Sequence, residues 1–314
     1  VVDGVIQNSP VVVEVLKDLM KRLKISTAGR RAAISLGGSS VLIKKVGIPL
    51  GGDSDFDEQI YYEAEQHFQL DMADLYYDHA KLGAPFGEGG EVPVLLIGAK
   101  RDMVEQHIAC IRGAGLRPGV IECDVFSVAN MFEYSYGVVK GLIAIVNVGC
   151  TSTQVSLLLN GDYLYTRDVP IGGEEFTRRI VDTMGIDRAQ AESLKVSSSQ
   201  GEDNVPPELN SILTEINDQL VAEVRMTVDF YFQSGELPAD VGGVNYVFMT
   251  GGSCRVLGLD AALAASMQLP VQIINPFQRV DINPRRFEMD YILMQGHLYG
   301  VAVGLGMRSV GDGE

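Results

Sequence analysis

The sequence IAIVNVGCTSTQVSLL, residues 143–158, decides the fold. Two apolar runs flank a short turn that contains Asn147, Gly149, Thr151 and Ser152. Such runs predict two buried strands, and the glycine predicts the turn between them. Because glycine lacks a Cβ, backbone N–H groups in this turn can surround a phosphate, and the two hydroxyls add donors. An ordinary hairpin turn is the alternative, so this stretch alone leaves the choice open.

A second hairpin follows directly. The runs TQVSLLL (153–159) and YLYTRDVPI (163–171) lie on either side of Asn160, Gly161 and Asp162. Asn-Gly between two β-rich runs is a strong hairpin signal, because both residues tolerate a positive φ. We therefore expect a strand, a glycine turn and a hairpin in succession.

A glycine pair marks the start of the next helix. Gly172 and Gly173 precede the helical pattern EEFTRRIVDTMG, which has Glu174 in its first turn. Further along, AESLK places Glu192 and Lys195 three residues apart, and therefore on one face of a helix. A carboxylate and an ammonium so placed can both reach sugar hydroxyls. The alternative is a surface ion pair, which contributes little to stability.

A second glycine pair ends a buried strand. VNYVFMTGG (244–252) runs into Gly251 and Gly252, and Ser253 begins the next turn. Paired glycines at the carboxyl end of a strand let a planar ligand approach the backbone closely. An ordinary strand-to-helix turn is the alternative here.

The rest of the chain predicts a smaller N-terminal unit and several helices. Asn8 opens an amphipathic helix, VVVEVLKDLMKRLKI (11–25). Over residues 30–124 the patterns alternate as β-β-α-β-β-α-β, which is enough for a small α+β subdomain. LNSILTEINDQLVAEVRMTVDFYFQ (209–233) predicts a long amphipathic helix or helix pair, and YILMQGHLYGVAVGLGMR (291–308) an apolar C-terminal helix.

Composition argues against several classes of function. The 314 residues are 46% hydrophobic and 21% charged, as expected of a folded protein with a sizeable core. The formal net charge of −16 argues against nucleic acid and anionic lipid as partners, because both bind clustered Lys and Arg. The cysteines and histidines show no metal-ligand spacing, and no apolar run in the sequence is long enough to span a bilayer. This cysteine usage fits a reduced, cytoplasmic compartment. Because the first residue is Val1, we expect a fragment of a longer protein.

The order of these features resembles one protein family. A strand, glycine turn and hairpin, then Gly-Gly and a helix, then Glu-x-x-Lys, and finally a strand ending in Gly-Gly is the layout of half an actin-like ATPase. The segments VVDGVI, LIAIVNVG, TRDVPIGGEEFTRRI, AESLK, VDFYFQ, TGGSCRVLGL and NPF resemble the PilM family of type IV pilus proteins, which is related to FtsA, and occur in the same order. The similarity covers nearly the whole chain, and the combination of motifs is specific although no single motif is.

The resemblance implies a fold and its subdomains. The fold class is α/β, a bilobed actin-like ATPase fold with ribonuclease H-like lobes and the extra subdomain 1C that PilM shares with FtsA. The implied subdomains are residues 1–29 for part of 1A, 30–124 for 1C, 125–140 for a connecting helix of 1A, 141–176 for 2A, 177–240 for 2B, and 241–309 for the rest of 2A with the C-terminal helix.

The resemblance also implies a nucleotide site. Its parts are the second phosphate motif (Asn147, Gly149, Thr151 and Ser152), part of the cleft (Gly172, Gly173 and Glu174), the ribose contacts (Glu192 and Lys195) and the adenosine motif (Gly251, Gly252 and Ser253). The implied ligand is ATP or ADP. Mg²⁺ would arrive with the nucleotide near Asn147, without direct ligation by the protein. No catalytic residue is assigned.

The resemblance further implies partners. The N-terminal cytoplasmic tail of the inner-membrane protein PilN would bind in a groove between subdomains 1A and 1C. Other inner-membrane pilus components and a ring of identical copies are also implied. The protein would lie at the cytoplasmic face of the inner membrane, and its membrane contact would be indirect.

Two departures from the family pattern weaken hydrolysis more than binding. The family has Asp where this chain has Asn147, and an amide cannot supply the negative charge that helps to hold Mg²⁺. The family's first phosphate motif, an Asp-x-Gly turn near the N-terminus, is missing from this sequence. We therefore expect an ATP-binding protein with weak or no ATPase activity. The alternatives are an active ATPase, a sugar-type kinase, an FtsA-like cell-division protein and the actin-like part of a type II secretion protein.

Overall fold

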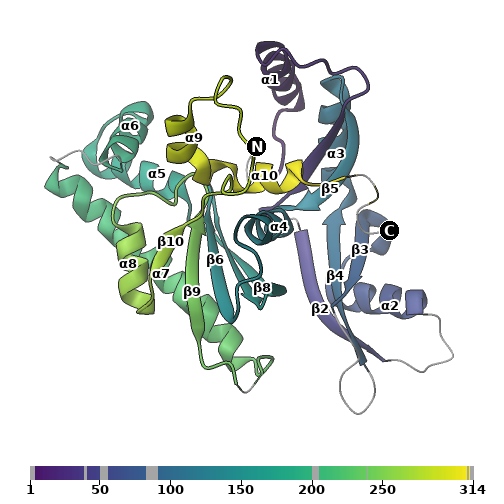
Figure 1. Ribbon diagram of the computed structural model, residues 1–314. Coiled ribbons are helices and arrows are strands. Elements are labelled where there is room, and N and C mark those ends of the chain that lie inside the picture. The colour runs from purple at the N-terminus through teal and green to yellow at the C-terminus, as the bar shows by residue number, and fades with distance from the viewer. Residues whose placement is uncertain are drawn as a thin grey trace. The chain divides into compact units, whose positions relative to one another are not determined.

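The computed structural model describes residues 4–38, 41–49, 56–82, 91–199, 205–238, 240–309 and 311. The chain divides into two compact units (Figure 1). Unit 1 comprises Val1–Asp124 with Arg308–Glu314, and unit 2 comprises Val125–Met307. The finer subdomain bounds given above stay a prediction.

Unit 1 contains a three-stranded antiparallel sheet in the order β2-β4-β3. The strands are β2 (Val41–Pro49), β3 (Leu75–Lys81) and β4 (Glu91–Lys100). Helix α2 (Phe56–Phe68) buries Ile60, Ala64 and Phe68, which recur every four residues and so form one apolar stripe. This stripe and the sheet form one hydrophobic cluster. A short 3₁₀ helix, η2 (Met72–Asp74), precedes β3.

A second sheet of unit 1 pairs β1 (Arg31–Leu36) with β5 (Arg117–Cys123) in parallel. Helix α3 (Arg101–Gly113) precedes β5 and packs against α1 (Ser9–Arg22). Asn8 caps α1, because its side chain accepts a hydrogen bond from the backbone N–H of Val11. The predicted strand and helix order of this region is confirmed. The sequence did not predict that β1 and β2 enter different sheets.

Unit 2 is built on a five-stranded mixed sheet in the order β10-β9-β6-β7-β8. Its strands are β6 (Leu142–Val148), β7 (Thr153–Leu159), β8 (Asp162–Val169), β9 (Val244–Thr250) and β10 (Val271–Ile273). Strands β6, β7 and β8 are antiparallel, whereas β9 runs parallel to β6 and to β10. The predicted strand, turn and hairpin are confirmed. Asn160 and Gly161 have φ angles of 54° and 95°, as their hairpin turn requires.

Strand β6 is buried on both faces, which explains its unbroken apolar sequence. Leu142 and Val146 belong to one hydrophobic cluster, whereas Ile143 and Ile145 belong to another. The first cluster holds α5 (Gly173–Met184), α6 (Arg188–Ser198), α7 (Pro207–Gln233) and α8 (Leu259–Met267) against the sheet. The second contains α4 (Asp124–Tyr136) and α10 (Gly300–Gly306). Figure 1 shows these helices of unit 2 on either side of its sheet.

Two helix predictions need refinement. The segment predicted as a helix or a helix pair is the single helix α7. The prediction of one C-terminal helix over 291–308 is wrong, because the structure has α9 (Met289–Gln295), the 3₁₀ helix η3 (Gly296–Tyr299) and α10 instead. The carbonyl of His297 in η3 accepts a hydrogen bond from the backbone N–H of Gly251 (2.9 Å), and this long-range bond favours the break. Within the described ranges, no helix combines the length and the apolar character needed to cross a membrane.

Candidate functional site

Two of the predicted glycine turns meet in unit 2. We call the turn at residues 147–152 the first glycine corner and the pair of Gly172 and Gly173 the second. The N–H of Gly173 donates to the carbonyl of Gly149 (3.0 Å), and the N–H of Glu174 donates to the carbonyl of Cys150 (2.7 Å). The turn between β6 and β7 is itself closed by a hydrogen bond from Gly149 N–H to the Ser152 carbonyl (2.9 Å). The start of α5 is therefore fastened to the predicted phosphate turn.

Gly172 makes this contact possible. A Cβ at this position would lie 2.6 Å from the carbonyl oxygen of Cys150 and 2.7 Å from the backbone nitrogen of Ser152. Both are backbone atoms, so no side-chain movement can relieve the clash. The glycine is required for close approach and not for an unusual backbone conformation, since its φ of −142° is extended.

The third glycine corner, residues 251–253, lies at the same edge of the sheet. Strands β6 and β9 are parallel neighbours, so their carboxyl ends lie together. The N–H of Ser253 donates to the carbonyl of Val148 (3.0 Å). A Cβ at Gly251 would lie 2.5 Å from Asn147 Oδ1, which places the Asn147 side chain directly against this glycine. All three corners therefore meet at one place.

A buried lysine ties α6 to this assembly. The Lys195 ammonium donates to the carbonyl of Gly173 (3.0 Å), to Thr177 Oγ1 (2.9 Å) and to Glu192 Oε2 (2.8 Å). The side chain of Lys195 is 8% exposed, whereas that of Glu192 is 49% exposed. Since an ammonium has three protons, these bonds use its whole donor capacity.

Glu192 keeps one face toward solvent. Partial burial works to raise the pKa of the Glu192 carboxyl, but hydrogen bonds from Lys195 and Thr177 outweigh it and hold this pKa below its ordinary value. The Thr177 hydroxyl lies 2.5 Å from Glu192 Oε2. Among the described residues, Glu192 Oε1 has no hydrogen-bond partner. The carboxylate is thus ionised and presents one free acceptor.

The remaining predicted residues lie around this assembly. Glu174 forms an ion pair with Arg188, with 2.7 Å between Arg188 Nη2 and Glu174 Oε2. Thr151 is exposed in the turn, and Ser152 is half-buried. The structure therefore brings the twelve predicted residues into one region of unit 2. Their contacts with a nucleotide stay a prediction.

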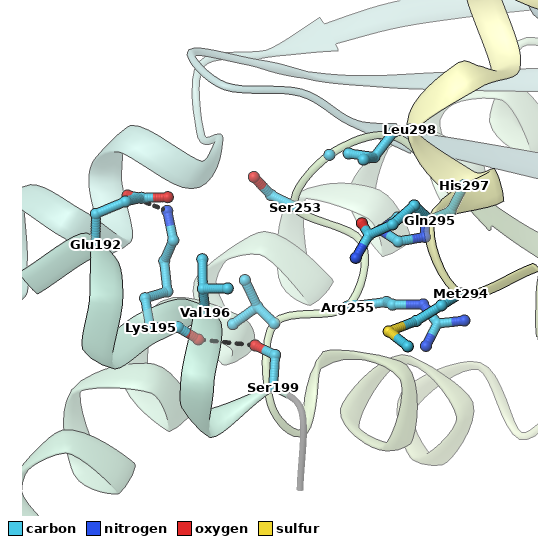
Figure 2. Close-up of a pocket in the computed structure, with 12 residues that line it drawn as sticks. Glu192, Lys195, Val196, Ser199, Ser253, Arg255, Met294, Gln295, His297 and Leu298 are labelled. Carbon is cyan, nitrogen blue, oxygen red and sulfur yellow. Dashed lines mark hydrogen bonds and ion pairs between the residues drawn. The ribbon is translucent and has the colours of Figure 1, made fainter. Parts of the chain in front are cut away.

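A pocket of about 490 Å³ adjoins these corners, within the size range of small-molecule sites. Figure 2 shows α6 on one side of it and the α9–η3 segment on the other. Four of the predicted residues line it, and the other eight lie at the end of β6, in the adjoining turns and at the start of α5. The lining residues are Glu192, Lys195, Val196, Ser199, Gly252, Ser253, Arg255, Val256, Met294, Gln295, His297 and Leu298.

Sequence reasoning missed the wall that α9 and η3 contribute. Met294, Gln295, His297 and Leu298 line the pocket about one hundred positions after Lys195 in the sequence, where only an apolar helix was predicted. Nothing local in that pattern indicates which face meets a ligand. Arg255 was also missed, although only Cys254 separates it from Ser253.

The electrostatics of this wall favour a neutral histidine. Burial and, to a smaller extent, the positive charge of Arg255 lower the pKa of His297 to about 4. Burial also raises the pKa of the nearby Cys254 thiol to about 12, so this cysteine is an inert part of the core. In the part of the chain that the structure describes, no three His, Cys, Asp or Glu side chains form a metal-binding group.

The sequence matches the family described as "Type IV pilus assembly protein PilM" over residues 1–310. Since this match spans nearly the whole chain, it covers both units and the pocket.

Solved structures show the same fold. The structure titled "PilM-PilN type IV pilus biogenesis complex" is 23% identical, with a TM-score of 0.84, and the match covers 99% of this chain and 88% of that chain. The ethanolamine utilization protein EutJ from Carboxydothermus hydrogenoformans is 13% identical, with a TM-score of 0.57 and coverage of 98% and 77%. MreB5 of Spiroplasma citri bound to ADP is 14% identical, with a TM-score of 0.53 and the same coverage. The predicted actin-like α/β fold is therefore confirmed.

Proposed function

The chain belongs to the PilM family of type IV pilus assembly proteins, and from this premise we propose that it is an actin-like scaffold that binds an adenine nucleotide in the pocket of unit 2. The observation that carries the proposal is the meeting of three glycine corners beside one pocket. Each corner is distant from the others in sequence, yet each depends on close backbone approach at the same edge of the sheet.

The residues of the site suit the parts of a nucleotide. Ribose hydroxyls can donate to Glu192 Oε1, which is ionised and free on its exposed side. Phosphate oxygens suit the hydroxyls of Thr151 and Ser152 and the backbone of their turn. The base then lies in the remainder of the pocket, between α6 and the α9–η3 segment. MreB5, a structural neighbour, is described with ADP bound.

The site fits nucleotide binding better than hydrolysis. Asn147 Oδ1 faces Gly251 where the three corners meet, so a hydrated cation that accompanies the phosphates would lie near this oxygen and contact it through its own water. That oxygen belongs to a neutral amide, and it supplies no negative charge to hold the cation. We therefore propose Mg²⁺-nucleotide binding with weak or no ATPase activity.

Membership of the PilM family suggests a partner protein for this chain. A neighbour of the same fold was solved in the PilM-PilN complex. We propose that this chain binds the N-terminal tail of PilN in the groove predicted between subdomains 1A and 1C. We also propose that ATP binding closes the cleft and alters this groove, so that the affinity for the tail changes. Such coupling requires the open and closed states of the protein to differ in their affinity for the nucleotide. Placement at the cytoplasmic face of the inner membrane, a ring of copies and other pilus partners belong to the same proposal.

Calorimetric titration of the full-length protein with ATP and with ADP tests the site. Binding of either nucleotide supports it, and a Glu192→Gln variant is expected to bind more weakly because a neutral amide is a poorer acceptor. Absence of binding by an intact, folded protein refutes the proposal. The PilN tail peptide is then titrated with and without ATP, and equal affinities contradict the proposed coupling.

An assay of phosphate release distinguishes a protein that only binds ATP from an active ATPase. We expect negligible steady-state release by the full-length protein, and more release by Asn147→Asp, which restores a carboxylate at the centre of the site. Rapid turnover by the unchanged protein supports the alternative of an active ATPase.

A further inference from the structure

The α9–η3 wall of the pocket carries a side chain that no part of the site has yet used. Gln295 is the last residue of α9 and lines the pocket. Figure 2 shows its amide pointing from α9 into the pocket, toward the side where Ser253 lies. Among the described residues, this amide has no hydrogen-bond partner. It therefore presents one free acceptor and two free donors to whatever occupies the pocket.

The two sides of the pocket offer different chemistry. On α6, Glu192 and Lys195 form an ion pair that is suited to hydroxyl groups. Across the pocket, Gln295 is neutral and lies between Met294 and the buried, neutral His297. A neutral amide in an apolar wall suits the edge of a heterocyclic base, because it can donate and accept side by side.

We propose that Gln295 is the residue that selects adenine over guanine, an inference that rests on the proposed nucleotide-binding function. The N6/N7 edge of adenine presents a donor beside an acceptor, and an amide pairs with both at once. The same edge of guanine presents two acceptors, O6 and N7. The amide can satisfy only one of these, and its own oxygen then faces the other.

Arg255 is the competing candidate, because Arg pairs with guanine O6 and N7. It lines the same pocket, and among the described residues its guanidinium has no partner. Figure 2 shows Arg255 extending away from Ser253 toward Met294, whereas the amide of Gln295 points into the pocket. The geometry therefore favours the amide as the group that meets the base edge.

The test compares ATP, GTP and 7-deaza-ATP by calorimetric titration of the full-length protein and a Gln295→Met variant of similar shape. 7-Deaza-ATP keeps the amino group of adenine but lacks the N7 acceptor. We expect the unchanged protein to prefer ATP over both analogues by roughly tenfold, the size of one bidentate contact. Gln295→Met is expected to weaken ATP binding by a similar factor and to remove both preferences.

Two control variants sharpen the result. Gln272→Met changes an exposed glutamine on β10 outside the pocket and should keep both preferences. Arg255→Met tests the competing residue. The inference is overturned if Gln295→Met keeps the preference for ATP, if the unchanged protein binds 7-deaza-ATP as tightly as ATP, or if only Arg255→Met alters the preference. If the unchanged protein binds no purine nucleotide, the proposed function itself fails.

Discussion

Replacing Gly172 with alanine should loosen the joint between α5 and the turn after β6. The added Cβ would meet Cys150 O at 2.6 Å, Cys150 C at 2.7 Å and Ser152 N at 2.7 Å, so the backbone must shift. That shift weakens the hydrogen bonds from Gly173 and Glu174 to the turn. Overpacking costs about 1–3 kcal/mol and two weakened hydrogen bonds about 1 kcal/mol each, whereas alanine returns about 0.5–1 kcal/mol through the unfolded state. We expect a net loss of roughly 2–4.5 kcal/mol.

Urea unfolding followed by circular dichroism measures this loss. Gly306→Ala is the matched control, because among the described residues no heavy atom outside its own helix turn lies within 4 Å of the Cβ that it adds, and the residue ends α10. It should leave stability unchanged or raise it by up to about 1 kcal/mol. A Gly172→Ala protein as stable as the Gly306→Ala protein would refute the close contact. Nucleotide affinity of the folded variant should also fall, since the turn is displaced.

Three further outcomes follow from the same region. Lys195→Met keeps the buried aliphatic chain but removes three hydrogen bonds, and it should lower the free energy of unfolding in urea by roughly 2–4 kcal/mol. Arg188→Ala breaks only an exposed ion pair with Glu174 and should cost less than about 1 kcal/mol in the same assay. The folded pKa of His297, about 4, lies below its unfolded value of about 6.5. Its contribution, roughly 3 kcal/mol at most, is therefore present above pH 6.5 and lost as pH falls toward 4, and His297→Gln should flatten this part of a stability–pH curve.

The turns of the site could be predicted from the sequence, because glycine at such positions is recognisable without knowledge of the fold. Gly172 and Gly251 stand where a Cβ would strike backbone or Asn147, and each follows a strand or precedes a helix. The hairpin at Asn160 was equally clear, because Asn-Gly has few other uses between β-rich runs. Residues that must be small, or must adopt a positive φ, are visible without knowledge of the fold.

The wall formed by α9 and η3 could not be predicted in the same way. Gln295 and His297 lie in an apolar sequence whose periodicity favours one continuous helix. The observed break is supported by a long-range hydrogen bond to Gly251, and nothing within the segment specifies that partner. For the same reason, the parallel pairing of β1 with β5 was not predicted, since strand patterns indicate faces but not neighbours.

The Glu192 and Lys195 pair shows how geometry refines a motif. Spacing alone gives both side chains equal access to a sugar. In the structure the Lys195 ammonium is buried and its three protons are used within the protein, so contact with ribose requires it to give up one of three hydrogen bonds. Glu192 Oε1 can accept a hydrogen bond from ribose without breaking any bond within the described protein. The carboxylate is therefore the stronger candidate for the sugar contact, and the lysine holds that carboxylate ionised and fixes it to the start of α5.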